Sequence, residues 1–142
     1  MTDWTTRYLD LAQFVSTWSK DPSTKVGAVI VSPTNRVIAL GFNGFPTSVV
    51  DDSRLNDRTQ KYEVIIHGEI NAIITAARPL TLHTLYTFPF LPCSRCASIV
   101  IQSGITRVFS PRNTTERWEP NLDVSRGLFS EAGIYTAEVD YL

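Results

Sequence analysis

The stretch HGEINAIITAA spans residues 67–77, and PCSRCASIVIQSG spans residues 92–104. The first has apolar residues at Ile70, Ile73 and Ile74, and the second repeats apolar residues at a similar spacing. Apolar residues that recur three and four positions apart line one face of a helix. We therefore expect two helices here, the first beginning at its histidine and the second at its first cysteine.

Short apolar or β-branched runs surround these helices and indicate strands. A hairpin followed by alternating strands and helices predicts a mixed, mostly parallel sheet with helices on both faces. Right-handed crossovers would place the two helices described above on one side of that sheet. We expect strands at residues 26–32, 36–42, 84–88, 106–110 and 134–139, further helices at 3–19 and 122–132, and a long polar loop at 43–61.

The composition indicates one globular domain, residues 1–142. With 43% hydrophobic residues, the chain has enough apolar side chains for a core without disulfides. Its net charge of −1 argues against a long nucleic-acid partner, which usually requires a basic stripe. No run approaches the roughly 20 apolar residues of a membrane span, and the first residues do not resemble a secretory signal. We expect a cytoplasmic protein (host cytoplasm if viral) that does not bind membranes.

Four polar residues in the two opening stretches have the spacing of a metal site. Cys93 and Cys96 lie three positions apart at a helix start, and His67 begins the neighbouring helix. Imidazole nitrogen and thiolate sulfur suit zinc, and catalytic zinc sites use three protein ligands with one open position. We predict one catalytic zinc ion held by these three residues, with Glu69 beside it.

Two other interpretations of the cysteine pair remain at this point. A structural zinc site needs four protein ligands, and His83 would have to be the fourth; its turn-like surroundings instead suggest a surface or loop histidine. A redox pair would leave His67 and Glu69 without a role.

The spacing His67-x-Glu69 together with Pro92-Cys93-x-x-Cys96 is itself the signature of zinc-dependent nucleobase deaminases, so the chemistry is recognised here by motif. In that chemistry water attacks C4 of a cytosine. We expect Glu69 to move a proton from the water to ring nitrogen N3 and then one to the departing ammonia.

The resemblance extends beyond this motif. The segments VGAVIV, GFNGFP, DD…LNDR…KY before HGEINAI, PFLPCSRCA and IQSGI together resemble the deoxycytidylate (dCMP) deaminases of the cytidine deaminase superfamily. The match covers roughly residues 5–137. It implies a three-layer α/β/α sandwich with a five-stranded mixed sheet.

The resemblance also implies how the protein assembles and is regulated. Relatives of this kind usually form homohexamers, and many are activated by dCTP and inhibited by dTTP. It implies that Asn43 contacts the nucleotide sugar, although asparagine is also a common turn residue. Gly44, Phe45 and Asp52 are expected to border the effector site.

The substrate phosphate needs cations or backbone amides. Lys25 is the first candidate because it precedes the first strand, with Ser23 and Thr24 as hydroxyl donors. Other cations considered for this role are Lys20, Arg54, Arg58, Lys61, Arg95 and Arg112.

Three further residues are expected near the base. Ile66 and Pro92 are expected to wall it. Gly68 replaces the alanine usual in the family, and we hypothesise that the missing methyl group widens the pocket slightly.

The sequence thus predicts hydrolytic deamination of dCMP to dUMP for thymidylate synthesis. Acceptance of dCTP is an open alternative, as is deamination of cytidine or deoxycytidine. A tRNA adenosine deaminase would need a basic face that the composition does not show. A non-catalytic zinc-binding module is the alternative from a different class.

Overall fold

A five-stranded sheet runs through residues 3–141, the part of the chain that the computed structural model describes. Its strand order is β2-β1-β3-β4-β5. The strands are Gly27–Val31 (β1), Val37–Phe42 (β2), Thr84–Phe88 (β3), Arg107–Pro111 (β4) and Tyr135–Val139 (β5).

Strand β1 is antiparallel to both its neighbours, β2 and β3. Strands β3, β4 and β5 pair in parallel. The sheet is therefore mixed, as predicted, but two of its four pairings are antiparallel, because the strand after the hairpin joins β1 rather than β2. All five residues of β1 are buried, as expected for a strand covered on both faces.

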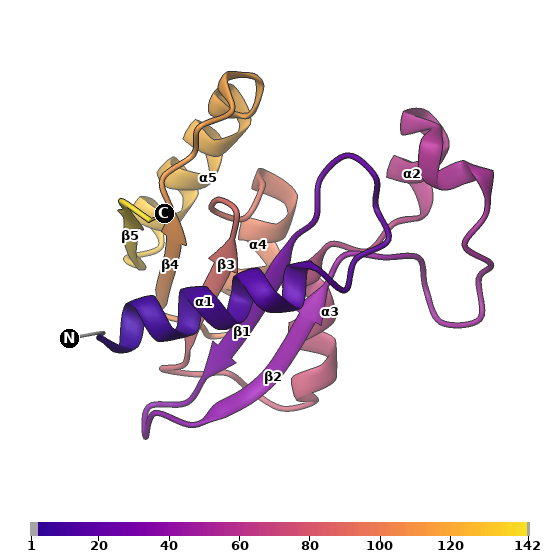
Figure 1. Cartoon of the computed structure of the whole chain (residues 1–142). Coiled ribbons are helices and arrows are strands. Elements are labelled where there is room, and N and C mark those ends of the chain that lie inside the picture. The colour runs from indigo at the N-terminus through magenta and orange to yellow at the C-terminus, as the bar shows by residue number, and fades with distance from the viewer. Residues whose placement is uncertain (1–2, 142) are drawn as a thin grey trace.

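Helices cover the two faces unequally (Figure 1). Helix α1 lies across β1 and β3 on one face, while α3, α4 and α5 lie behind the sheet. The α-helices are Trp4–Ser16 (α1), Arg58–Val64 (α2), Gly68–Ala76 (α3), Ser94–Gln102 (α4) and Glu119–Glu131 (α5), and the 3-10 helices are Ser53–Asn56 (η1) and Glu116–Trp118 (η2).

Alternating side chains of the strands supply two separate cores. Val29 and Tyr86 face α1, whereas Ile30 and Leu85 face the α3–α5 layer. This period of two is what a sheet buried on both faces requires. The three-layer α/β/α arrangement predicted from the resemblance is thus confirmed, and α3 and α4 lie on the same face.

Two helical segments were not predicted in the region expected to be a loop, residues 43–61. The 3-10 helix η1 lies within this region, and α2 begins in it and continues to Val64. Helix α2 stands apart from the sheet in Figure 1. Among residues 3–141, no helix has the length and hydropathy needed to cross a membrane.

Candidate active site

The metal-site residues meet where two neighbouring helices begin. His67 immediately precedes α3 and Cys93 immediately precedes α4, each at the N-cap position. Neither side chain caps its own helix, so both remain available to a ligand. Cys96 lies on the first turn of α4, three residues beyond Cys93, and is buried.

The three ligand atoms converge. His67 Nδ1 lies 3.1 Å from Cys96 Sγ and 3.4 Å from Cys93 Sγ, and all three atoms lie within 4.8 Å of one another. The adjacent Cys96 thiol lowers the pKa of Cys93 to about 4, against the effect of burial. The same contact, together with burial, raises the pKa of Cys96. A dication would favour both thiolates at once, because metal ligands must be deprotonated.

Glu69 lies on the first turn of α3, beside this cluster. Its side chain is buried, 4% exposed, and its Oε1 has no hydrogen-bond partner within the protein. Burial raises the pKa of the Glu69 carboxyl to about 7, while the nearby His67 acts in the opposite direction. A carboxyl with a pKa near neutrality is suited to accept and then donate a proton.

The donor set fits a zinc ion with an open position. Two thiols and one imidazole converge, and the Glu69 carboxyl does not belong to this group of ligand atoms. Three protein ligands leave the fourth position of a tetrahedral zinc ion open. Within residues 3–141, no other cluster of three or more His, Cys, Asp or Glu has this geometry.

The four-ligand alternative does not fit. His83 lies outside the cluster, and its Nδ1 is 2.9 Å from the Thr81 carbonyl oxygen. It lies in the loop before β3, one of the two locations expected for it, but it is buried there, 9% exposed, and not on the surface.

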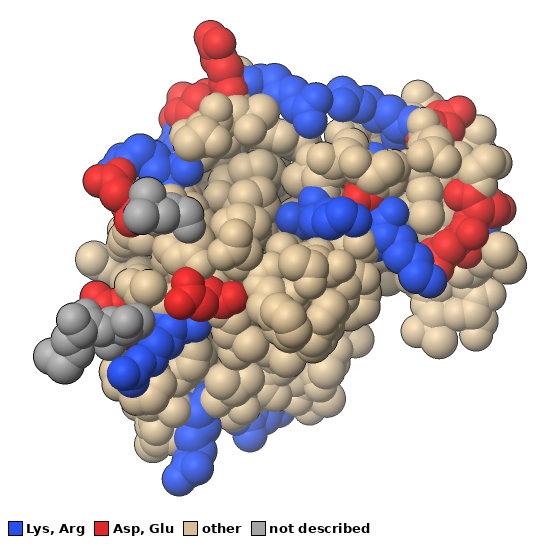
Figure 2. Space-filling view, in the orientation of Figure 1, with Lys and Arg blue, Asp and Glu red and all other residues tan. Residues whose placement is uncertain are grey.

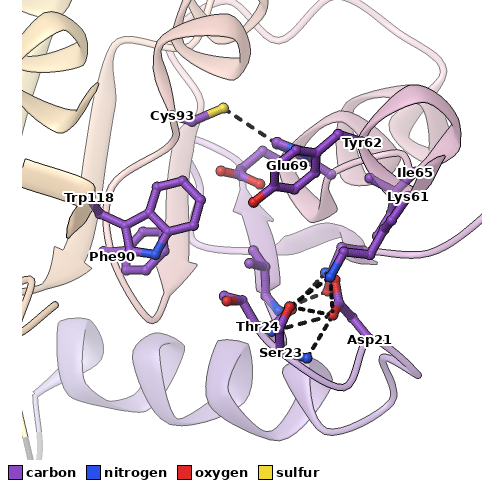
Figure 3. A pocket seen from close by; sticks show the side chains of 13 residues that line it. Asp21, Ser23, Thr24, Lys61, Tyr62, Ile65, Glu69, Phe90, Cys93 and Trp118 are labelled. Atoms are coloured by element: carbon purple, nitrogen blue, oxygen red, sulfur yellow. Dashed lines mark hydrogen bonds and ion pairs between the residues drawn. The ribbon is translucent and has the colours of Figure 1, made fainter. Parts of the chain in front are cut away.

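A cavity opens beside the metal site (Figure 3). His67, Glu69 and Cys93 line one end, and a polar group around Asp21 and Lys61 lines the other. Figure 3 shows the rings of Phe90 and Trp118 on one side and Tyr62 and Ile65 on the opposite side. The complete set of lining residues is Asp21, Ser23, Thr24, Val26, Asn43, Lys61, Tyr62, Ile65, His67, Glu69, Phe90, Cys93 and Trp118.

Three of the residues predicted to bind substrate line this cavity: Asn43, Ser23 and Thr24. The buried Asn43 already has protein partners. Its Oδ1 accepts a hydrogen bond from the Val26 amide at 2.9 Å, and its Nδ2 donates to the Thr24 carbonyl at 2.9 Å. These bonds join the end of β2 to the segment before β1, so Asn43 shapes this side of the cavity.

The other four residues predicted to bind substrate do not line the cavity: Lys25, Ile66, Pro92 and Gly68. The Lys25 ammonium donates to the Ser19 carbonyl at 2.6 Å. Ile66 pairs with Gly44 in a β-bridge. Successive side chains of extended backbone point in opposite directions, so Ile65 faces the cavity and Ile66 faces away.

Pro92 and Gly68 contribute to the packing around the site. Pro92 is buried, and its carbonyl oxygen accepts a hydrogen bond from Ser125 Oγ at 2.7 Å. A Cβ at Gly68 would lie 3.2 Å from Val26 Cγ1 and 3.3 Å from Phe42 Cα, so it would point towards the strands. An added methyl group would affect the cavity through Val26, which does line it.

The predicted effector residues occupy a different place. Gly44 and Phe45 line a groove with Ile66 and Ile74, separate from the cavity. Asp52 caps η1 and accepts hydrogen bonds from the Arg54 amide and side chain. It is not among the residues that line this groove.

Several lining residues were missed or were not singled out from the sequence. Lys61 was one of seven candidate cations, and nothing distinguished it from the others. Trp118 packs against Phe90, with ring centroids 5.5 Å apart, and it also lines the cavity. No sequence pattern near Asp21 indicated its place in the cavity, because its partner Lys61 lies 40 residues away.

Charges on the surface in view do not form one continuous basic stripe. Figure 2 shows largely uncharged atoms, with Lys and Arg in separate groups and Asp and Glu beside several of them. This distribution accords with the net charge of −1.

The family described as "cytidine and deoxycytidylate deaminase zinc-binding region" matches residues 2–110, which include all three metal-site residues and Glu69. The chain belongs to this family. Its members bind zinc through the His/Cys/Cys set that His67, Cys93 and Cys96 form here. The protein is thus a zinc-dependent deaminase of the cytidine and dCMP deaminase family.

Individual relatives support this placement. An uncharacterized deaminase of Aliivibrio fischeri is 42% identical over 134 residues, covering 92% of this chain and 90% of its own. The deoxycytidylate deaminase of Mus musculus is 30% identical over 138 residues, covering 93% of this chain and 77% of its own. The cyanophage S-TIM5 dCMP deaminase, solved in complex with dCMP and dUMP, is similar in fold, with a TM-score of 0.73 at 23% identity and 94% coverage of both chains.

Proposed function

We propose that the protein hydrolyses the exocyclic amino group of dCMP, giving dUMP and ammonia. The observation that carries this proposal is the buried Glu69 carboxyl. It has an oxygen without a protein partner and lies in the same cavity as His67 and Cys93. Burying an acid without a partner costs folding free energy, and groups of this kind are concentrated at functional sites.

In the proposed reaction Glu69 transfers protons, and water is activated by the bound zinc ion. Zinc, when bound, supplies a Lewis acid that lowers the pKa of water towards neutrality. Glu69 accepts a proton from the attacking water and delivers it to N3 of the base as the oxygen adds to C4. It then takes the proton of the new C4 hydroxyl group and passes it to the amino nitrogen, so that the C4–N bond breaks, ammonia leaves and the C4 carbonyl of dUMP forms. Its pKa near 7 leaves both protonation states accessible.

The cavity walls suit a flat pyrimidine ring. Phe90 and Trp118 present aromatic surface on one side, and Ile65 presents an apolar side chain on the other. Stacking against such surfaces is worth about 1–3 kcal/mol per base. We expect the base to lie between these walls with C4 towards the metal site. The sugar then extends towards Asn43.

Two observations favour a nucleotide over a nucleoside. The mouse relative is a deoxycytidylate deaminase, and the S-TIM5 enzyme was solved with dCMP and dUMP bound. Ser23 and Thr24 line the end of the cavity away from the metal site, where hydroxyl donors would reach the sugar or its phosphate. We retain Lys25 as a phosphate contact, which would require its ammonium to leave the Ser19 carbonyl. The same end of the cavity would decide whether dCTP is also a substrate.

The resemblance supports three further predictions. The product dUMP would serve thymidylate synthesis in the cytoplasm. The chain would form a homohexamer, and dCTP and dTTP would act as activator and inhibitor at the groove lined by Gly44 and Phe45.

The test uses purified protein of measured zinc content. It is incubated with dCMP, CMP, deoxycytidine and dCTP, with and without dTTP, and ammonia release is followed. We expect the highest kcat/KM with dCMP. Turnover of deoxycytidine alone would reassign the substrate to a nucleoside. Ammonia release from none of the four would contradict deamination of cytosine compounds and favour a zinc-binding module.

A further inference from the structure

Helix α2 buries a charge where a helix usually buries an apolar stripe. Lys61, 4% exposed, is the one buried residue of its seven. Short helices are held in place chiefly by packing of an apolar face. The attachment of α2 to the rest of the protein therefore depends on what the Lys61 ammonium contacts.

That ammonium donates hydrogen bonds to two residues of the segment before β1. Lys61 Nζ lies 3.0 Å from Asp21 Oδ1 and 2.7 Å from Ser23 Oγ. The ion pair is nearly sealed from solvent, with the two side chains 6% and 5% exposed. Removing one partner of such a pair leaves an uncompensated buried charge, which is strongly destabilising.

Asp21 in turn is connected to the rest of the fold. Its Oδ1 also accepts from the Ser23 amide at 2.8 Å, and its Oδ2 accepts from Asn43 Nδ2 at 3.3 Å. Asn43 follows β2 directly and is bonded to the Val26 amide before β1. The carboxylate thus fixes the Lys61 ammonium to the end of the β1–β2 hairpin that lies beside the cavity.

The position of α2 matters because α2 and the residue after it form one wall of the cavity. Tyr62 and Ile65 both line it, facing Phe90 and Trp118. Helix α2 otherwise lies close to η1, which is itself part of the segment between β2 and α3. Glu69 and the metal ligands, in contrast, stand at the starts of α3 and α4, which pack on the sheet.

We propose that Lys61 is a positioning residue, whose ion pair with Asp21 seats α2 so that Tyr62 and Ile65 form the wall against which the substrate binds. Its effect on turnover rests on the proposed function, whereas the seating of α2 does not. Because the pair touches neither Glu69 nor the metal ligands, its loss raises KM and leaves kcat and zinc content nearly intact.

The test compares Lys61→Met, Asp21→Asn and their combination with a matched control. Asp51→Asn removes a carboxylate from a second ion pair, Lys20–Asp51, whose side chains are 73% and 37% exposed. For each variant we would measure zinc content, kcat and KM for dCMP, and hydrogen–deuterium exchange of the amides of residues 58–66.

We expect Lys61→Met and Asp21→Asn each to raise KM about ten-fold or more, with kcat within about three-fold, and to speed exchange in α2 by a similar factor. In the double variant, KM and the exchange rate in α2 should rise no further than in Lys61→Met, because no unpaired charge is left buried. Asp51→Asn should change neither quantity by more than about two-fold.

Unchanged exchange in α2 with unchanged KM, in the isosteric Asp21→Asn as well as in Lys61→Met, would overturn the proposal. A fall in kcat or zinc content with KM unaltered would also overturn it, because the pair would then act on the metal end. If the wild-type protein does not deaminate dCMP, the proposed function fails. The exchange measurement alone then decides whether the pair seats α2.

Discussion

The two ends of the cavity are built in different ways. At the metal end, His67, Cys93 and Glu69 stand at the starts of helices that pack on the sheet. At the other end, Asp21 and Lys61 come from irregular or weakly packed segments and are joined by a buried ion pair. The chemistry is thus placed on helices that pack on the sheet, whereas the wall formed by α2 depends on the polar contacts of one lysine, Lys61. Substitutions at the first end should abolish reaction, and those at the second should weaken binding.

The largest expected effect is at the metal end. Cys96→Ala removes a thiolate that is buried against His67 and Cys93. Two remaining ligands bind zinc far more weakly, so we expect zinc content and deamination both to fall to background. Zinc is measured by inductively coupled plasma mass spectrometry.

The control for this substitution is Ser98→Ala, on the exposed side of the same helix, which should retain both zinc and turnover. Full zinc occupancy with normal activity in Cys96→Ala would show that Cys96 is not a metal ligand that the reaction requires.

A second, smaller effect concerns stability at the other end. Ordinarily burial would raise the pKa of Asp21, but hydrogen bonds from the Ser23 amide, Lys61 and the Ser23 hydroxyl outweigh it and hold the pKa below its usual 3.8. The folded state therefore favours the carboxylate. The resulting stability is present above pH 3.8 and is lost as pH falls through the lower folded value.

We therefore expect Asp21→Asn to lower the free energy of unfolding by about 3 kcal/mol at pH 7. The difference from the wild type should shrink as pH drops below 3.8. Urea unfolding at a series of pH values measures it, with Asp51→Asn as the control. A difference that stays constant down to pH 3 would mean that the Asp21 charge is not what stabilises this end.

The smallest effect is expected at Gly68, which stands between His67 and Glu69 at the start of α3 but does not line the cavity. An alanine Cβ would be crowded by Val26 at 3.2 Å, and that crowding would oppose the helical preference of alanine over glycine. We expect the free energy of unfolding to change by less than about 1 kcal/mol and KM by about two- to three-fold. Kinetics with dCMP and deoxycytidine measure the second quantity.

Gly127→Ala is the matched control, because a Cβ there would meet nothing within 4 Å, and it should stabilise α5 by about 0.5–1 kcal/mol. An identical substrate profile in Gly68→Ala would show that the absent methyl group does not widen the pocket.

The same contrast explains what the sequence could predict. The ligands were predictable because their signal is local: Cys93 and Cys96 share one helical turn, and His67 and Glu69 share the start of another. The helices and strands that carry them have regular apolar periods, and each was found within a few residues of its predicted bounds.

The other end had no such local signal. The Asp21–Lys61 pair joins residues 40 positions apart, and a lone lysine in a polar segment is usually a solvated surface charge. Helix α2 lacks an apolar stripe, so its periodicity did not distinguish it from a loop. Ile66 was predicted to wall the base, but Ile65 lines the cavity; in extended backbone a shift of one residue reverses the direction of the side chain.

The most direct test of the account is a single-turnover measurement with wild-type protein and Glu69→Gln at equal, full zinc occupancy. The substitution keeps the size of the side chain but removes its ability to carry a proton between water, N3 and the leaving amino group. General acid–base catalysis contributes about 10²–10⁴-fold, so we expect dUMP formation from dCMP to slow by about a thousand-fold while zinc and dCMP still bind. Turnover by Glu69→Gln at the wild-type rate would contradict the assignment of Glu69 as the proton carrier.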